Sequence, residues 1–133
     1  MQDPPKTEAI LELVAAFLRN EVMPQVSGAL AFQVRVCANA VDLSRRHMEL
    51  TPASDAAELA SLQALLGADG DLATLNTEFC DRIRRQEIGL STPGVLEHLR
   101  ATTLAKLAVD QPSYAAYRRA KQDWADAPSG PAA

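Results

Sequence analysis

The sequence predicts an all-α fold, a single helical bundle of five to six helices. Alternation of apolar and polar residues with a period of two, the mark of a half-buried strand, is nearly absent. Apolar residues instead recur at three- and four-residue spacing, and prolines and glycines stand between these periodic stretches. A chain of 133 residues, 47% of them hydrophobic, is long enough for one domain with its own core. We assign residues 1–127 to the bundle domain and residues 128–133 to a flexible C-terminal tail.

Prolines, glycines and capping side chains predict where the helices begin and end. Pro24 ends the first helix, Thr51-Pro52 separates the second from the third, and Gly67 ends the third. Asp71 is a suitable cap for the fourth helix, and Thr92-Pro93 is a suitable start for the fifth. The expected helices cover, in order, about residues 6–22, 26–50, 52–66, 72–85, 93–110 and 113–127.

The second expected helix is apolar on two sides and polar on one. Its two apolar lines, roughly opposite each other, are Leu30, Val34, Cys37, Val41 and Met48, and Phe32, Val36, Ala40 and Leu43. Arg35, Asn39 and Asp42 lie in a narrow polar strip between them. This pattern is typical of the central helix of a bundle. The strip is either a solvated, ion-paired edge or a surface that contacts a ligand or partner.

Composition and charge exclude several classes of protein. The chain has 17 acidic and 13 basic residues, a formal net charge of −4, which argues against a general nucleic-acid binder. It has no apolar run of the ~18 residues that a membrane span needs. Its first residues, MQDPPKTEAI, do not form a signal peptide, so we expect a cytoplasmic protein. Cys37 and Cys80 form no CxxC pattern and are expected to be buried free thiols.

No catalytic, metal-binding or cofactor-binding pattern is present. The sequence has no GxSxG elbow, no phosphate loop ending in Lys-Ser/Thr and no Glu-x-x-His pair. Cys37 and His47 are separated by about 15 Å along one expected helix, too far for a nucleophile and its base. We therefore assign no catalytic residue, no metal ligand and no cofactor, and a stand-alone enzyme is the weaker hypothesis.

The C-terminal third carries the candidate partner-binding residues. Arg100 falls within the apolar arc of its helix, where a guanidinium needs a carboxylate, a helix-end carbonyl or a partner surface. It is either an intramolecular, snorkelling arginine or an interface anchor. The last expected helix places Tyr, Trp and basic side chains together, and these residue types often anchor interfaces. The alternative is an aromatic face that packs on its own bundle. The candidates in this helix are Tyr114, Tyr117, Arg118, Lys121 and Trp124.

Four segments of the sequence, taken in order, resemble one small bacterial domain family of unknown function. They are MQDPPKTEAILELVAAFLRNEVMP, GALAFQVRVCANAVDL, LLGADGDLATLN and LRATTLAKLAVDQPSYAAY. Members of that family are typically encoded beside, or fused to, kinases resembling aminoglycoside phosphotransferases. The resemblance implies a small accessory subunit of a two-component kinase that phosphorylates hydroxyacyl-CoA thioesters in short-chain acid catabolism. It supplies no catalytic residue.

The leading hypothesis is therefore a binding module. Its expected partner is the kinase subunit, and through that partner it would contact the CoA part of an acyl-CoA substrate. One alternative is a stand-alone helical enzyme or a binder of CoA or another anion, with a pocket near Arg35, Asn39 and Asp42. A second alternative is a self-associating structural protein, a homo-oligomer.

Overall fold

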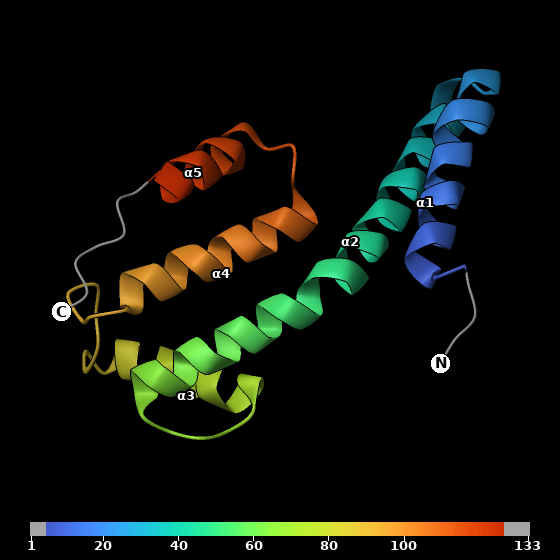
Figure 1. The fold of residues 1–133 in the computed structure, drawn as a ribbon. Coiled ribbons are helices and arrows are strands. Elements are labelled where there is room, and N and C mark those ends of the chain that lie inside the picture. The colour runs from blue at the N-terminus through green and yellow to red at the C-terminus, as the bar shows by residue number, and fades with distance from the viewer. Residues whose placement is uncertain (1–4, 127–133) are drawn as a thin grey trace. The chain divides into compact units, whose positions relative to one another are not determined.

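A computed structural model describes residues 5–126, and within them the chain forms five α-helices and no β-strand (Figure 1). The described part is 81% helical, which confirms the predicted all-α fold. The chain divides into two compact units, residues 1–51 and residues 52–133. The predicted tail, residues 128–133, lies outside the described residues. The helices are α1 (Thr7–Phe17), α2 (Gly28–Leu66), α3 (Leu72–Arg84), α4 (Val95–Asp110) and α5 (Ala115–Asp126).

The first unit is a helical hairpin of α1 and the beginning of α2 (Figure 1). After α1 the chain continues through a π-helical turn, Leu18–Val22, and a 3₁₀ turn, Met23–Gln25. The predicted helix of residues 6–22 is therefore helical from Thr7 to Val22, but its last turn is wider than an α-turn. α2 begins at Gly28, whose φ of +58° suits a residue without a Cβ.

The two helices of the hairpin meet through small and polar side chains. Ala15 and Ala38 are 1% and 0% exposed, and they are the buried residues of this unit within residues 5–51. Arg19, in the π-helical turn after α1, reaches Asp42 of α2 at 2.5 Å and donates to Asn39 Oδ1 at 3.1 Å. The polar strip of α2 therefore contacts the turn that follows α1. Helix axes approach closely where the contacting side chains are small, so alanine suits this position.

The apolar lines of α2 are not covered in the way the sequence predicts for a central helix. Leu30, Phe32, Val36 and Met48 are 52%, 65%, 49% and 42% exposed. Cys37 is also exposed, so the prediction that it is a buried thiol is wrong. In the first line only Val34 and Val41 are partly buried, so helical periodicity identifies which residues share a line but not how far a neighbouring helix covers it.

The predicted break at Thr51-Pro52 is also wrong, because α2 continues from Gly28 to Leu66 with Pro52 inside it. Proline removes one backbone donor and crowds the preceding turn, which costs about 3 kcal/mol in a helix interior. Strong helix formers follow it, including Ala56, Ala57 and Glu58. The boundary between the two units falls at this proline.

The second unit has a core of large apolar side chains, contributed by the last part of α2, by α3 and by α4. Its buried members are Leu62, Leu66, Leu75, Phe79 and Val95, with Leu59, Leu65, Leu72, Ile88 and Leu99 packed against them. Gly67 ends α2 with a φ of +60°, as predicted, and its N–H donates to the Gln63 carbonyl at 2.9 Å.

The start of α3 is capped as the sequence predicts. Asp71 Oδ1 accepts from the Thr74 N–H at 2.9 Å, and Oδ2 accepts from the Thr74 hydroxyl at 3.1 Å. These bonds, the backbone one first, lower the pKa of Asp71. Arg82 donates to the last carbonyl of α2, at Leu66, over 3.3 Å, so α3 also closes the end of α2.

Candidate functional site: a groove between α4 and α5

The turn between α4 and α5 brings two apolar helix faces together. At the end of α4 the Gln111 N–H donates to the Leu107 carbonyl at 2.9 Å. Pro112 follows and cannot continue the helix, and the Tyr114 N–H then donates to the Gln111 carbonyl at 3.0 Å. α5 begins one residue later and returns beside α4 (Figure 1). The predicted helices 93–110 and 113–127 thus correspond to α4 and α5 within two residues.

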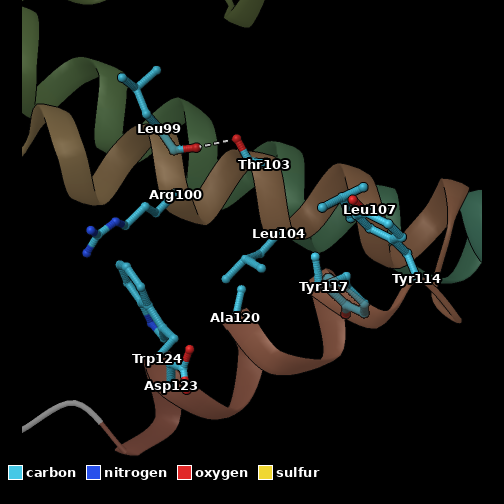
Figure 2. Close-up of a pocket in the computed structure, with 11 residues that line it drawn as sticks. Leu99, Arg100, Thr103, Leu104, Leu107, Tyr114, Tyr117, Ala120, Asp123 and Trp124 are labelled. Carbon is cyan, nitrogen blue, oxygen red and sulfur yellow. Dashed lines mark hydrogen bonds between the residues drawn. The ribbon is translucent and has the colours of Figure 1, made fainter.

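A groove of about 580 Å³ lies between these two helices, within the second unit. Figure 2 shows Leu107, Tyr114 and Tyr117 at one end of it, and Leu104 opposite Ala120 in the middle. Arg100, Asp123 and Trp124 stand at the other end. The groove therefore has an apolar, aromatic end and an end that carries both charges. Its full lining is Leu99, Arg100, Thr103, Leu104, Leu107, Tyr114, Ala116, Tyr117, Ala120, Asp123 and Trp124.

Four of the predicted partner-binding residues meet in this groove: Arg100, Tyr114, Tyr117 and Trp124. Tyr117 is 8% exposed and forms part of the wall, so this tyrosine packs on its own bundle. Tyr114 and Trp124 are 52% and 42% exposed and present large aromatic surfaces. Arg118 and Lys121 are exposed and do not line the groove, although Lys121 has the helical spacing of Tyr117 and Trp124.

Arg100 is exposed at the charged end of the groove. The sequence places it within an apolar arc, which left open an intramolecular arginine or an anchor for a partner. Figure 2 shows its guanidinium extending toward the Trp124 side chain. A charged head at the edge of an apolar groove keeps its hydration while its methylene stem covers apolar surface.

Sequence reasoning missed the part of the α5 wall formed by Ala116, Ala120 and Asp123. Ala120 is three residues after Tyr117 and four before Trp124, so it lies on the same helical face. An alanine between two aromatic residues on one face leaves space, and that pattern is the signal that a groove is present. Asp123 has no such signal, because an isolated carboxylate on a terminal helix is ordinary.

His98 forms a second polar cluster in the same unit. It is 4% exposed, its Nδ1 lies 2.9 Å from Ser61 Oγ, and its ring meets Phe79 edge-on at 5.0 Å. Burial lowers the pKa of His98; the Glu58 carboxylate opposes this, and the Lys106 ammonium adds to it. The ring is therefore neutral near pH 7.

The Ser61–His98 pair has the donor and acceptor of a nucleophile and base, but not the third group that orients a base. Glu58, the nearby carboxylate, accepts instead from Asn76 Nδ2 at 2.8 Å. Among residues 5–126, no carboxylate hydrogen-bonds the His98 ring. Ser61 and His98 line a small cavity of about 90 Å³ beside Glu58, and also an open pocket of about 450 Å³ beside Gly94 and Trp124. With no carboxylate in this part of the chain to orient the His98 ring, the pair is an incomplete catalytic set. The cluster fits a role in stability.

The second set of candidates, Arg35, Asn39 and Asp42, lies on α2 in the first unit. Asn39 and Asp42 both contact Arg19, and Asp42 also lies 4.0 Å from Arg45. Arg35 is exposed. Two of these three residues thus have a structural role in holding the π-helical turn after α1 against α2. Cys80, like Cys37, is free and exposed, so its predicted burial is wrong as well.

Comparison with known proteins gives one match. The model of a family described as a domain of unknown function, DUF6285, matches residues 24–114. The matched region includes α4 and ends at Tyr114, so α1 and α5 lie outside it. No curated protein and no solved structure matches the chain. In the described part of the chain, no helix is both long enough and apolar enough to span a bilayer.

Proposed function

This chain belongs to the DUF6285 family of domains of unknown function, and we propose that it is a non-catalytic subunit that binds and supports a kinase. The kinase is one that resembles the aminoglycoside phosphotransferases and phosphorylates hydroxyacyl-CoA thioesters in short-chain acid catabolism. The sequence resemblance to a kinase-associated family motivates this partner. Because ATP and CoA thioesters are cytoplasmic substrates, we place the pair in the cytoplasm.

The groove between α4 and α5 is the observation that carries the proposal. Its lining is mostly apolar, it is open, and aromatic side chains occupy both ends. These are the properties of grooves that accept an amphipathic helix of a partner. We assign that helix to the kinase. Its apolar side chains would pack on Leu104, Leu107 and Tyr114, and a polar group at its end would pair with Arg100 or Asp123.

The subunit would act on the kinase by population shift. A ligand that binds one of two conformations more tightly raises the population of that conformation. The groove would hold the kinase helix in the arrangement that is competent for substrate, without a chemical step on this chain. Arg118 and Lys121 are exposed cations on α5, outside the groove. They are the residues we propose for contact with the phosphates of a CoA held by the kinase.

The stand-alone enzyme is the less well supported alternative. Its candidate pocket residues include Asn39 and Asp42, and both contact Arg19 in the hairpin. Among residues 5–126, no three or more His, Cys, Asp or Glu side chains form a group able to hold a metal ion. A binding module requires no metal-binding group, and the groove between α4 and α5 supports this function directly.

A charge placed in the groove tests the proposal. Ala120 is exposed within the groove, so Ala120→Glu puts a carboxylate among apolar side chains without removing a core residue. We expect the affinity for the co-expressed kinase, measured by titration calorimetry, to fall by roughly a hundredfold, a typical hot-spot effect. ATP consumption with a hydroxyacyl-CoA substrate should fall in parallel when the subunit is not saturating.

Gln122→Glu is the matched control. Gln122 is exposed on α5 but does not line the groove, so it adds the same charge to the same helix. We expect its affinity for the kinase to stay within about twofold of the wild type, since isolated surface substitutions have small effects. A kinase that turns over equally well with this chain omitted would exclude the accessory role. Equal losses of affinity for both variants would exclude the groove as the docking site.

A further inference from the structure

α1 carries an apolar ridge on the side that does not pack on α2. Ile10, Leu13, Val14 and Phe17 are 45%, 69%, 41% and 56% exposed, whereas Ala15 between them is 1% exposed. The spacing of three and four residues puts the four side chains on one helix face. An amphipathic helix normally buries such a face against another helix. The described hairpin therefore leaves one helix-packing surface of α1 without a partner.

The ridge is symmetric about its own centre. Leu13 and Val14 are adjacent, Ile10 is three residues before Leu13, and Phe17 is three residues after Val14. If two copies of α1 pack antiparallel with a two-fold axis between Leu13 and Val14, Ile10 of one copy meets Phe17 of the other. In an isologous interface residue i contacts j and j contacts i, and this pattern satisfies that condition at every apolar position of the ridge.

The charges just beyond the two ends of α1 have the same symmetry in sequence. Lys6, the extended N-cap of α1, is seven residues before Leu13, and Glu21, in the π-helical turn, is seven residues after Val14. Both are exposed, and within residues 5–126 neither makes an ion pair with another residue of the chain. In the antiparallel arrangement Lys6 of each copy lies opposite Glu21 of the other. A parallel arrangement would instead bring like charges together at both ends.

We propose that α1 pairs with α1 of a second copy of this chain, antiparallel and two-fold symmetric about Leu13 and Val14. A self-complementary arrangement of both apolar and charged residues fits a second copy better than an unrelated helix, which needs no such symmetry. The ridge is small beside the roughly 800 Å² per partner of a standard interface. The dimer is therefore weak and concentration-dependent, and it places two α4–α5 grooves on one particle.

The arrangement can be tested by exchanging the charges of Lys6 and Glu21. The dimer Kd is measured by sedimentation equilibrium at low salt, over micromolar to millimolar protein concentrations. Lys6→Glu alone and Glu21→Lys alone each put like charges opposite each other at two symmetric places. Each should raise the dimer Kd roughly tenfold, because two exposed pairs change sign together. The double variant Lys6→Glu/Glu21→Lys restores opposite charges and should return the Kd to within about threefold of the wild type.

Two further variants control for charge and for folding. Glu12→Lys changes the net charge as Glu21→Lys does, but Glu12 lies off the ridge, so the dimer Kd should not change. Leu13→Glu puts two carboxylates at the axis and should leave a monomer with unchanged far-ultraviolet helicity. A wild-type monomer at millimolar concentration would overturn the proposal. So would a dimer that is indifferent to Leu13→Glu, or single charge variants that behave like the wild type, as parallel pairing predicts.

Discussion

In the second unit Leu62, Leu75 and Phe79 are 0%, 2% and 3% exposed, whereas in the first unit the buried residues are alanines and Leu13 is 69% exposed. The second unit buries large apolar side chains in a core of its own. The first unit joins its helices through Ala15, Ala38 and the Arg19–Asp42 ion pair. Large-side-chain burial provides most of the folding free energy of a domain, and alanine contacts provide little. The exposed large apolar residues of the hairpin, such as Leu13 and Phe32, are therefore available for contacts with other molecules.

The largest expected effect compares one leucine from each unit. Leu62→Ala deletes a fully buried side chain and should lower the free energy of unfolding by about 3 kcal/mol. Leu13→Ala removes an exposed side chain and should change it by less than about 0.5 kcal/mol at low protein concentration. Urea unfolding followed by circular dichroism measures both. Similar losses for the two variants would show that the hairpin has a core as well.

A backbone position in the second unit should show the next effect. Gly94 caps α4 with a φ of +84°, and a Cβ there would lie 3.0 Å from Leu65 Cδ2 in the core. Gly94→Ala should therefore cost about 2 kcal/mol, from both the strained φ and the close contact. Gly89→Ala is the matched control, because a Cβ at Gly89 meets nothing within 4 Å. If thermal denaturation gave the same midpoint for both variants, Gly94 would not be restrained by the core.

A smaller effect concerns the ion pair of the hairpin. Asp42→Ala removes the carboxylate that Arg19 contacts at 2.5 Å and that Arg45 approaches at 4.0 Å. We expect a loss of about 1 kcal/mol, because these partly exposed groups are screened by solvent. Glu49 is the other acidic partner of Arg45 and is 52% exposed, so Glu49→Ala should cost under about 0.5 kcal/mol. If urea unfolding showed equal losses of unfolding free energy for Asp42→Ala and Glu49→Ala, Asp42 would contribute no more than an ordinary surface charge.

The smallest effect is a pH dependence located in the second unit. Because burial lowers the pKa of His98 in the folded state, the unfolded chain binds a proton more readily as the pH falls below 6.5. The contribution of His98 to the free energy of unfolding is therefore fully present above pH 6.5, and it decreases as the pH falls toward the folded-state pKa of His98. We expect His98→Gln to reduce the slope of unfolding free energy against pH between about pH 7.5 and 5.5. The reduction should correspond to the uptake of up to about one proton on unfolding.

His47 provides the control for this slope. His47 is the other histidine of the chain, it is exposed in the first unit, and its Nδ1 lies 3.0 Å from Thr51 Oγ1. A slope that disappears with His47→Gln, and persists with His98→Gln, would assign the pH dependence to the hairpin.

The sequence predicts local features of this fold well. Gly67 and Asp71 are identified because a positive φ and a capping carboxylate act over a few residues. The continuity of α2 through Pro52 is not predictable in this way. It depends on whether the helix formers on either side outweigh one lost hydrogen bond. The exposure of Cys37 was missed for a different reason, since a helix with two apolar lines does not indicate which of them its neighbour covers.

In the candidate site, too, local residue types are predictable from the sequence and helix packing is not. The residue types at Arg100, Tyr114 and Trp124 indicate an interface, and these residues do line one groove. Helical spacing predicts Lys121 on the face of Tyr114 and Trp124, with Arg118 beside it, but neither lines the groove. Which residues face the groove depends on how α5 returns along α4 after Pro112, and that is a property of the connection rather than of the helix pattern.

The exposure of both thiols has a practical consequence. Cys37 belongs to residues 1–51 and Cys80 to residues 52–133, so each half of the molecule has one accessible sulfhydryl. Maleimide dyes or nitroxides would therefore attach once to each half of the unaltered polypeptide. Energy transfer or dipolar spectroscopy between the two labels would then report the span between the halves, and whether kinase capture changes it, with no engineered attachment point.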